Sequence, residues 1–194
     1  MNAPLFSGST FRAMEIGEAD LPALQRFFEA NPEYFHRVAG EDPAADEARQ
    51  VFESRPPADW PHGRMWHLRF LDGQGETVAM AELVSDLFAE GVWHIGLFVV
   101  ATRLHGTGSS ALLYEGLEGW MRGRGVRWLR LNVASGNRPA ERFWEKSGYT
   151  EVRRRDGVDI GTRIHTMRVM TKPLANGSMA EYLDLVTRDR PGAP

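Results

Sequence analysis

The chain has 194 residues and a formal net charge of −3, and it contains no cysteine. Its composition, 42% hydrophobic and 25% charged, is that of a globular protein, and its length favours one domain. These features exclude a disulfide framework and thiolate sites, do not favour a nucleic-acid partner, and leave no apolar run long enough to span a membrane.

The N-terminal part is expected to hold a leader, a strand and a helix. Residues 1–10 are expected to be a flexible leader that lacks the basic and apolar blocks of a signal peptide, which favours a cytoplasmic protein. A first strand is predicted over Phe11–Ile16. Asp20 can cap a helix whose apolar residues share one face, and Asn31-Pro32 ends that helix.

One more helix is expected before the first hairpin. Tyr34–Gly40 is predicted to be irregular. Pro43–Phe52 is rich in alanine and predicts a second helix, which ends before a pair of prolines. Arg55–Arg64 is then expected to be a loop.

Three strands are predicted next. Met65–Leu71 and Thr77–Val84 flank a turn of Asp and Gly residues, so they should pair as a hairpin. Val92–Val100 is almost wholly apolar, which indicates a central strand covered on both faces. A glycine-bearing segment then leads straight into a helix predicted over Ser110–Arg124.

The following segments predict a strand, a helix and a second hairpin. The strand is expected over Arg127–Val133, and Asn137 can cap a helix that ends at Gly148. Tyr149–Arg155 and Thr162–Thr171 are expected to pair around the Asp-Gly pair that follows the first of them.

This order of elements predicts an α/β fold with a mixed sheet and helices on both faces. It does not fit a doubly wound Rossmann sheet. Residues 11–174 are expected to form one domain. Residues 175–194 are expected to be a C-terminal extension in which Ser178–Glu181 has capping-box spacing ahead of a short helix, with a frayed end.

The most informative segment lies between the apolar strand and the helix after it. His105–Ser110, with glycines at 106 and 108, is a tight loop that opens a helix. A helix N-terminus offers free backbone N–H groups and the positive end of the helix dipole, so an anion such as a diphosphate is its natural ligand. The loop does not fit a P-loop, because no Lys-Ser/Thr follows the second glycine.

With the strand before it, this loop resembles the pyrophosphate loop of the GNAT superfamily of N-acetyltransferases, Arg/Gln-x-x-Gly-x-Gly/Ala. One alignment places the pattern on Arg103, Gly106 and Gly108. The other, which we favour, places it on His105, Gly108 and Ser110 and aligns the following helix without a gap.

A second block strengthens the resemblance. Leu129–Val133 and residues 137–149, which read NRPAERFWEKSGY, are similar to the family's L-x-V and N-x-x-A-x-x-F/L-Y-x-K-x-G-F segments in order and spacing. The resemblance implies a GNAT fold, in which the central sheet is mixed and mostly antiparallel and its fourth and fifth strands splay around the cofactor. It also implies a bacterial N-acyltransferase that uses acetyl-CoA or another short-chain acyl-CoA.

The resemblance also implies where the cofactor binds. The pantetheine arm is expected to pair with the backbone of the fourth strand, and Asn137 is expected either near that arm or as a simple helix cap. No histidine has metal-ligand spacing, so no metal site is expected. The expected cofactor-binding residues are Phe98, Val99, Val100, Arg103, His105, Gly106, Thr107, Gly108, Ser109, Ser110, Asn137, Phe143 and Trp144.

Direct transfer to an amine, as the family performs it, needs a base that takes the ammonium proton. Glu82 and His94 are the catalytic candidates. Partial burial on its strand could raise the pKa of Glu82 towards neutral pH, and the ordinary pKa of histidine already suits a base. Each could instead be structural, and water could mediate the proton transfer. Trp144 stands where the family has a tyrosine that protonates the thiolate, which an indole N–H cannot do. Tyr114 and Tyr149 are the alternatives.

The acceptor is expected to be a small-molecule or peptide amine, with no nucleic-acid or membrane partner, and the protein a monomer or a homodimer. The resemblance implies that the acceptor contacts Tyr34, Phe35, His36 and the last hairpin near Asp156–Gly161. Two functions stay open: a working N-acyltransferase, and a GNAT-fold module that binds CoA or a partner with little or no turnover. The departures from the family pattern at His105, Ser110 and Trp144 motivate the second.

Overall fold

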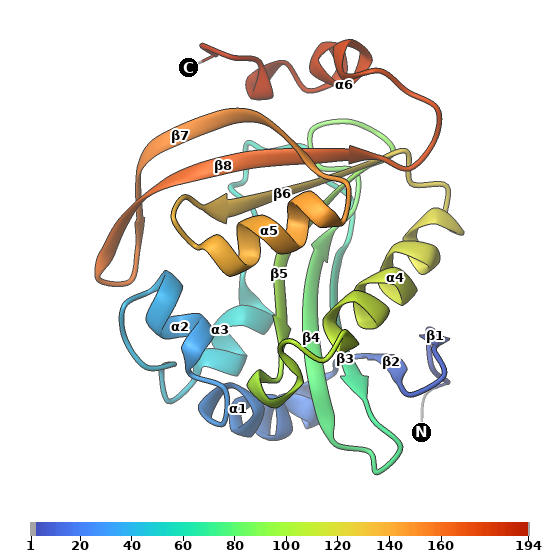
Figure 1. The fold of residues 1–194 in the computed structure, drawn as a ribbon, viewed down its shortest axis with the longest axis vertical. Coiled ribbons are helices and arrows are strands. Elements are labelled where there is room, and N and C mark those ends of the chain that lie inside the picture. Colours follow the sequence, from blue (N-terminus) through green and yellow to red (C-terminus); the bar gives the residue numbers. More distant parts are fainter. Residues whose placement is uncertain (1–2, 194) are drawn as a thin grey trace.

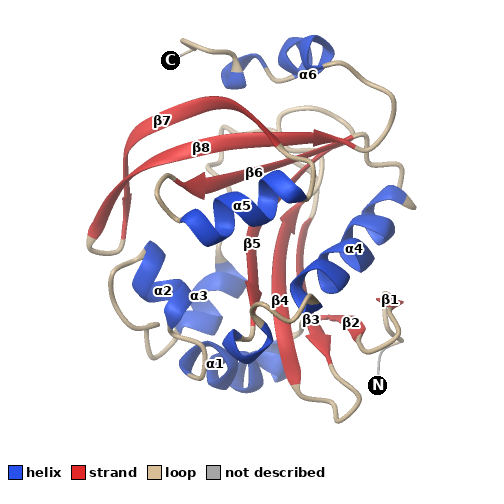
Figure 2. Ribbon diagram, viewed as in Figure 1, coloured by secondary structure: helices blue, strands red, loops and turns tan. Residues whose placement is uncertain are grey.

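The computed structural model describes residues 3–193, which form an open eight-stranded sheet with helices on both faces (Figures 1 and 2). The strand order is β1-β2-β3-β4-β5-β6-β8-β7, and only β5 and β6 pair in parallel. The mixed, mostly antiparallel α/β fold expected from the sequence is thus confirmed. None of the helices in residues 3–193 combines the length and the apolar character needed to cross a membrane.

The strands are β1 (Phe6–Ser7), β2 (Arg12–Glu15), β3 (Met65–Leu71), β4 (Thr77–Val84), β5 (Val92–Val100), β6 (Trp128–Ala134), β7 (Thr150–Ile160) and β8 (Arg163–Pro173). The helices are α1 (Leu21–Glu29), α2 (Glu33–Val38), α3 (Glu47–Glu53), α4 (Ser109–Arg122), α5 (Arg138–Lys146) and α6 (Met179–Leu185). Short 3₁₀ helices lie at Thr102–Leu104 and Thr187–Asp189.

Two hydrophobic clusters hold the helices on the sheet. On one face, α4 and α5 contribute Leu117 and Trp144 to a cluster that includes Ile95 of β5. On the other face, α1 and its neighbours contribute Phe28 to a cluster that includes Val99 of the same strand. Because β5 buries side chains on both faces, its sequence is almost continuously apolar.

Strands β5 and β6 pair only near their N-terminal ends, over Val92–Ile95 and Trp128–Leu131. In the pairing of β4 with β5, Glu82 faces Leu97 and Leu83 faces Ile95, so Gly96 is an extra residue and forms a β-bulge. A bulge bends its strand and redirects the side chains that follow. Beyond it the two strands diverge, and we call the region between Gly96–Val100 and the end of β6 the splay.

The N-terminal segment is more ordered than expected for a flexible leader. Phe6–Ser7 forms β1 and pairs with β2. Phe6 packs on Phe70 and stacks on Trp120 with ring centroids 5.6 Å apart, so burial fixes it to the sheet. The leader predicted over residues 1–10 is therefore wrong at this strand, and residues 1 and 2 lie outside the described residues.

The irregular segment predicted over Tyr34–Gly40 is also wrong, because it contains most of helix α2. Phe35 is buried and packs edge-on against Phe28 of α1, with ring centroids 5.2 Å apart. A helix of this length is unstable alone, so its packing on α1, rather than its own sequence, stabilises it.

The second hairpin turns later than predicted. Asp156-Gly157 is not the turn; Gly157, with a φ of 69°, lies in a bulge of β7 where the pairing register shifts. The chain instead turns between Ile160 and Arg163. An Asp-Gly pair suits a turn and a glycine bulge alike because both use a positive φ, so its sequence does not distinguish them.

The C-terminal extension packs on the end of the sheet. Helix α6 begins with the predicted capping box, in which Glu181 N donates to Ser178 Oγ at 3.3 Å and Ser178 N donates to the Glu181 carboxylate. Below it, the buried Asp189 accepts two hydrogen bonds from Arg130, of 2.7 and 3.0 Å, and one from the Tyr182 hydroxyl at 2.7 Å. These bonds fasten residues up to Asp189, while residue 194, part of the expected frayed end, lies outside the described residues.

Candidate active site

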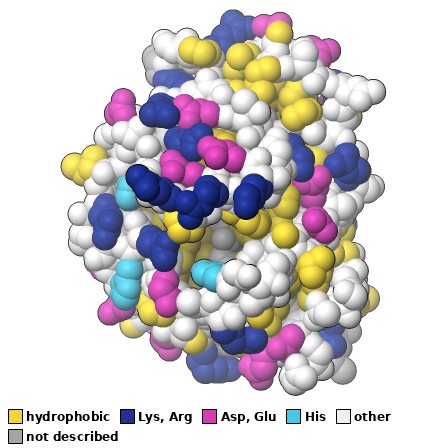
Figure 3. All heavy atoms as spheres, in the orientation of Figure 1, with side chains coloured by type: hydrophobic (Ala, Val, Ile, Leu, Met, Phe, Trp, Pro, Cys, Tyr) yellow, Lys and Arg dark blue, Asp and Glu magenta, His cyan; other side chains and the backbone are white. Residues whose placement is uncertain are grey.

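The candidate site lies in the splay. Strands β5 and β6 run in the same direction, so their C-terminal ends diverge from the bulge at Gly96. The end of β5 leads toward the glycine loop His105–Ser110, and the end of β6 leads to α5. In the orientation of Figure 1, the surface is hollowed between α5 and the segment that leads into α4, with Lys and Arg side chains along the α5 side (Figure 3).

The glycine loop presents free backbone donors to open space. Gly106 and Gly108 have φ values of 77° and 87°, which turn the chain sharply into α4. Within residues 3–193, the N–H groups of Gly106, Gly108 and Ser110 donate to no protein acceptor. A Cβ at either glycine would meet no atom within 4 Å. Open space before three free donors at a helix N-terminus fits an anionic group such as a diphosphate.

The segment before the loop is held in place by Asn31, which follows α1, and by Glu33, the first residue of α2. The Thr102 backbone N–H donates to Asn31 Oδ1 at 2.7 Å, and the Thr102 hydroxyl donates to Glu33 Oε2 at 2.6 Å. The hydroxyl bond lowers the pKa of Glu33, so this carboxylate stays ionised and keeps its acceptor at neutral pH. The loop is therefore anchored before any ligand binds.

The two alignments of the loop place different side chains at its start. His105 Nε2 lies 3.0 Å from the Val100 carbonyl, so the imidazole turns back onto the end of β5. Arg103 has a side chain 60% exposed and lies 3.6 Å from Asp72, in the turn between β3 and β4. The His105 side chain thus connects the loop to β5, whereas the Arg103 side chain points to the turn between β3 and β4.

Aromatic side chains line the gap between β5 and α5. Phe98 stacks on Phe143 with ring centroids 6.1 Å apart, and its ring lies 6.0 Å from that of Trp144. Trp144 is buried and packs edge-on against Tyr114. The Tyr114 hydroxyl donates to the Tyr149 hydroxyl at 2.9 Å, and burial raises the pKa of both phenols. Both tyrosines are thus poorer acids than a free phenol.

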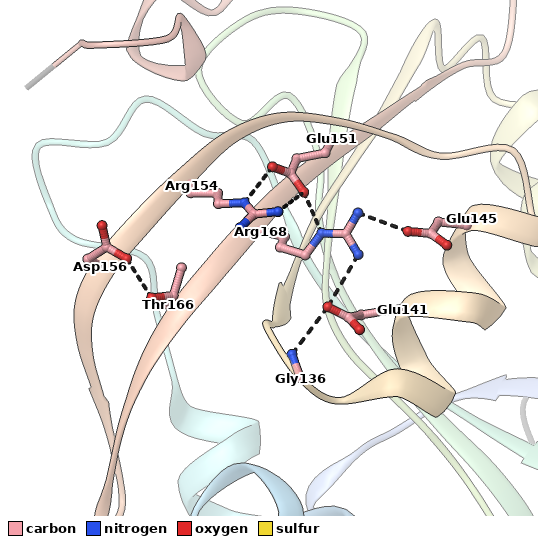
Figure 4. A network of polar contacts seen from close by, with 8 residues as sticks. All are labelled: Gly136, Glu141, Glu145, Glu151, Arg154, Asp156, Thr166 and Arg168. Atoms are coloured by element: carbon pink, nitrogen blue, oxygen red, sulfur yellow. Dashed lines mark hydrogen bonds and ion pairs between the residues drawn. The ribbon is translucent and has the colours of Figure 1, made fainter.

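Arg168 of β8 fixes the position of α5 (Figure 4). Its guanidinium contacts Glu141 and Glu145 of α5 at 3.3 and 2.9 Å and Glu151 of β7 at 2.5 Å. Glu141 also accepts a hydrogen bond from the Gly136 N–H at 3.2 Å. This network ties α5 and the turn before it to the β7–β8 hairpin, and so fixes where this wall of the splay stands.

Asn137 stands at the N-cap position of α5, but its side chain makes no capping hydrogen bond. The sequence left two roles open for Asn137, and the structure does not show the helix-capping one. The residue instead lines a surface cleft at the end of β6.

Glu82 lies at the vertex of the splay. Its Oε2 accepts a hydrogen bond from the Ser54 hydroxyl at 2.9 Å and lies 3.5 Å from His67 Nε2. In the described part of the chain, Oε1 accepts no hydrogen bond, and a Cβ added to Gly96 would lie 2.5 Å from it. Burial and the charge of Glu82 raise the pKa of Tyr34, so this neighbouring phenol stays neutral. One carboxylate oxygen is therefore held and the other faces the bulge of β5.

Sequence reasoning missed Ser54 and His67 as neighbours of Glu82. A regular hairpin continued from the pair of Leu71 with Thr77 would place His67 opposite Ala81. A one-residue bulge in β4 shifts the register, so His67 instead pairs with Glu82. A shift by one residue exchanges the two faces of a strand, and no residue type in the sequence marks it.

His94, the other base candidate, lies on the paired half of β5. Its Nδ1 is 3.3 Å from Arg130 Nη1, and Arg130 in turn binds Asp189. Burial and the charge of Arg130 lower the pKa of His94 to about 3. The imidazole is therefore neutral at neutral pH, and its acceptor nitrogen is already engaged by Arg130.

The residues expected to contact the acceptor divide between core and surface. Phe35 is only 5% exposed and packs in the core below α1. Tyr34 is half-buried on the same helix and close enough to Glu82 to feel its charge. His36 lines the cleft at the end of β6. The structure thus brings His36 to a surface cleft, keeps the Phe35 side chain in the core, and leaves Tyr34 half-buried against the α1 cluster.

The chain is similar to known acetyltransferases in sequence pattern and in fold. The sequence model of the family described as "Acetyltransferase (GNAT) family" matches residues 24–149. An acetyltransferase structure from Thermus thermophilus is 25% identical to the chain, with a TM-score of 0.66, and the match covers 85% of this chain and 97% of that one. Among curated proteins, none matches the chain by sequence.

More distant structures share the fold. The ribosomal-protein-S18-alanine N-acetyltransferase of Escherichia coli is 18% identical, with a TM-score of 0.62, over 87% of this chain and 97% of that one. A spermidine N-acetyltransferase from Vibrio cholerae, solved with CoA and spermine, is 16% identical, with a TM-score of 0.66, over 86% of this chain and 96% of that one.

Proposed function

Because this chain belongs to the GNAT acetyltransferase family, we propose that it is an N-acyltransferase that moves an acetyl or other short acyl group from acyl-CoA to a primary amine. The observation that supports this most is the splay itself. It combines an anchored loop of free N–H donors on the β5 side with an unengaged carboxylate oxygen of Glu82 at the vertex.

The cofactor would lie along β5. Acyl-CoA supplies the acyl group as an activated thioester. The N–H groups of Gly106, Gly108 and Ser110 would hold its diphosphate. Among the described strands, none pairs with the β6-facing edge of Gly96–Val100. The Val100 carbonyl bonds to His105, and the remaining backbone groups of this edge are open to the amides of the pantetheine arm.

Positive charge on α5 supports the binding of an anionic ligand in the splay. Arg138, Arg142 and Lys146 are exposed and stand four residues apart, so they share one side of the helix. Figure 3 shows Lys and Arg side chains along this margin of the hollow. A row of cations beside the free donors of the loop raises the local concentration of a phosphate-rich ligand.

Glu82 would act as the base. In the transfer, the amine nitrogen bonds to the acyl carbon, the carbon–sulfur bond breaks, and Glu82 takes the amine proton while the sulfur leaves as a thiolate. Ser54 would hold Oε2, with His67 Nε2 3.5 Å away, so that the free Oε1 faces the bulge of β5. His94 suits the role less, because its acceptor nitrogen is bonded to Arg130.

Trp144 would form a passive wall of the splay. It is buried among Phe98, Phe143 and Tyr114, and an indole N–H is not an acid at neutral pH. Tyr114 and Tyr149 have raised pKa values and bond to each other. The chain would thus supply no dedicated acid, which is tolerable because a thiolate is a weak base and leaves readily.

Thiol release from acetyl-CoA in the presence of a panel of primary amines tests this function. We expect release that requires both the protein and a particular class of amine. Calorimetric binding of acetyl-CoA without release for any amine would favour the alternative, a GNAT-fold module that binds CoA with little or no turnover. Failure to bind acetyl-CoA at all would contradict the assignment of the glycine loop.

A further inference from the structure

A surface cleft of about 530 Å³ opens at the C-terminal end of β6. It is lined by the end of α2, the β6–α5 connection and the start of β8. Ala134, the last residue of β6, belongs to this lining and lies beyond the point where β6 stops pairing with β5. The cleft, which we call the β6 cleft, therefore opens on the β6 side of the splay, opposite the glycine loop.

The charged lining of the β6 cleft is positive. Arg37 and Arg163 line it together with His36 and His165, and no carboxylate is among its lining residues. Asp42, which is not among the lining residues, bonds to the His36 imidazole at 2.7 Å. Within residues 3–193, neither Arg37 nor Arg163 has an ion-pair partner, whereas Arg168 of the same hairpin contacts three carboxylates.

The β6 cleft is built by segments far apart in the sequence. Thr162 donates to the Ala39 carbonyl through its N–H at 2.8 Å and its hydroxyl at 3.0 Å, and His165 Nε2 bonds to the Val38 carbonyl at 2.7 Å. These bonds fasten the β7–β8 turn to the C-terminal end of α2, and the two lie side by side in Figure 1. Arg37 and Arg163 lie next to these hydrogen bonds, so the bonds hold both arginines at the same cleft.

Gly40 makes room for one of these arginines. Its φ is 82°, and a Cβ at this position would lie 2.8 Å from Arg163 Nε and 2.5 Å from the Thr162 hydroxyl. The Arg163 side chain therefore passes over the C-terminal end of α2, through the space that a side chain at position 40 would fill. Arg37 lies on that same helix, so both arginines line one cleft.

We propose that the β6 cleft binds the acceptor and selects amines that carry a carboxylate or phosphate group. This inference rests on the proposed acyltransferase function. The anionic group would lie between Arg37 and Arg163, because guanidinium groups form paired, charge-assisted hydrogen bonds with both kinds of anion. The amine would point into the splay toward Glu82, past Tyr34. A polycationic amine would be repelled by the same two arginines.

Matched acceptors test the selectivity. Alanine is compared with alaninamide for the carboxylate, phosphoethanolamine with ethanolamine for the phosphate, and spermidine serves as the cationic probe. We expect thiol release from acetyl-CoA to have a kcat/KM at least about tenfold higher for the anionic member of one pair, which identifies the anion. Intrinsic chemistry favours alaninamide, whose amine is less basic, so a preference for alanine would report binding.

Variants of the two arginines test the site. Arg37→Gln and Arg163→Gln should each raise KM for the preferred anionic amine about tenfold and leave kcat within about threefold, as expected when a binding contact is lost. The KM of its neutral partner should stay unchanged. Arg12→Gln, which removes an exposed arginine of β2, is the matched control and should affect neither.

A binding experiment separates the two proposals if no amine releases thiol, because the proposed function then fails. Calorimetry would measure the binding of phosphoethanolamine or alanine to the protein saturated with acetyl-CoA. Binding that is lost in the Arg37→Gln/Arg163→Gln double variant would still support the proposed role of the β6 cleft. A preference for ethanolamine, alaninamide or spermidine would overturn the inference. So would anionic acceptors that bind the double variant as well as the unmodified protein.

Discussion

The two halves of strand β5 differ in what lies along their edges. Val92–Ile95 pairs with β6 along its whole length, and its last two residues also pair with β4 on the other side. Gly96–Val100 follows the bulge and, among the described strands, keeps only β4. We call the first the sealed half and the second the open half. One of the two candidate bases lies at each half: His94 belongs to the sealed half and contacts Arg130, and Glu82 of β4 lies opposite the bulge where the open half begins.

A cluster of bonded polar side chains lies beside the sealed half. Arg130, Asp189, Tyr182 and His94 bond to one another beneath the C-terminal extension. Around the open half, within the described residues, Glu82 Oε1 and three N–H groups of the glycine loop have no protein partner. A buried group that is fully bonded stabilises the fold, and a group without a partner is available to a ligand. Substitutions in the sealed half should therefore change stability, and those in the open half should change binding or turnover.

The largest effect is expected in the sealed half, from Asp189→Ala. Removing this carboxylate leaves the Arg130 guanidinium, which is 2% exposed, without its partner. Urea unfolding should show a loss of about 3–5 kcal/mol, typical of a broken buried ion pair. Asp184→Ala is the control, since its exposed pair with Arg190 should contribute less than about 1 kcal/mol. Equal losses in the two variants would mean that the cluster does not hold the extension.

The pH dependence of stability gives the next largest effect. The folded-state pKa of His94, about 3, lies below the ordinary value of 6.5, so the unfolded chain binds more protons between these pH values. Stability from His94 is thus complete above pH 6.5 and is lost as the pH falls. Between pH 7 and 5 this loss should be about 2 kcal/mol.

The His94→Asn variant isolates this contribution. Asparagine does not titrate, so the free energy of unfolding of the variant should fall by about 2 kcal/mol less over the same pH range. His62→Asn, which replaces an exposed histidine, is the matched control. A His94→Asn variant with the pH dependence of the unmodified protein would show that His94 is not held neutral.

A smaller change is expected for cofactor affinity in the open half. Gly108→Asp places a carboxylate where the diphosphate would bind, whereas Gly108→Asn has the same size without the charge. Both residues must adopt the positive φ of Gly108, which Asn and Asp tolerate. Calorimetry should give a Kd for acetyl-CoA about tenfold higher, or about 1.4 kcal/mol, for the aspartate variant than for the asparagine variant. Equal affinities would place the diphosphate elsewhere.

The smallest effect is expected from Trp144. If it is a passive wall, Trp144→Phe removes no proton donor, and turnover should change by no more than about threefold. Trp144→Tyr restores a phenol and should keep or increase turnover. Loss of transfer in Trp144→Phe with normal acetyl-CoA binding would instead assign the indole N–H a direct role.

The sequence pattern predicted the strands of the central hairpin and the apolar strand at their observed ends, Met65–Leu71, Thr77–Val84 and Val92–Val100. These segments have a strong alternation or a continuous apolar run, and both reflect burial on a sheet. The glycine loop was placed correctly between β5 and α4, because glycine and a helix start are local features.

The bulges could not be predicted, and the site depends on them. The bulge in β4 brings His67 to Glu82, and no residue type marks it. The bulge at Gly96 opens the splay; a glycine inside an apolar strand is compatible with a bulge but does not fix its register. Ser54 reaches Glu82 only through the packing of α3 on the sheet. Tertiary contacts of this kind leave no periodic signal, so the sequence named Glu82 but not its surroundings.

The most direct test of the division between the two halves compares Glu82→Gln with His94→Asn in steady-state turnover at neutral pH, with acetyl-CoA affinity measured on both. We predict that Glu82→Gln lowers kcat by about 10²–10⁴-fold, the usual contribution of a positioned base, with an unchanged Kd for acetyl-CoA. His94→Asn should keep kcat within about threefold. Normal turnover in Glu82→Gln together with a large loss in His94→Asn would contradict the assignment of catalysis to the open half of β5.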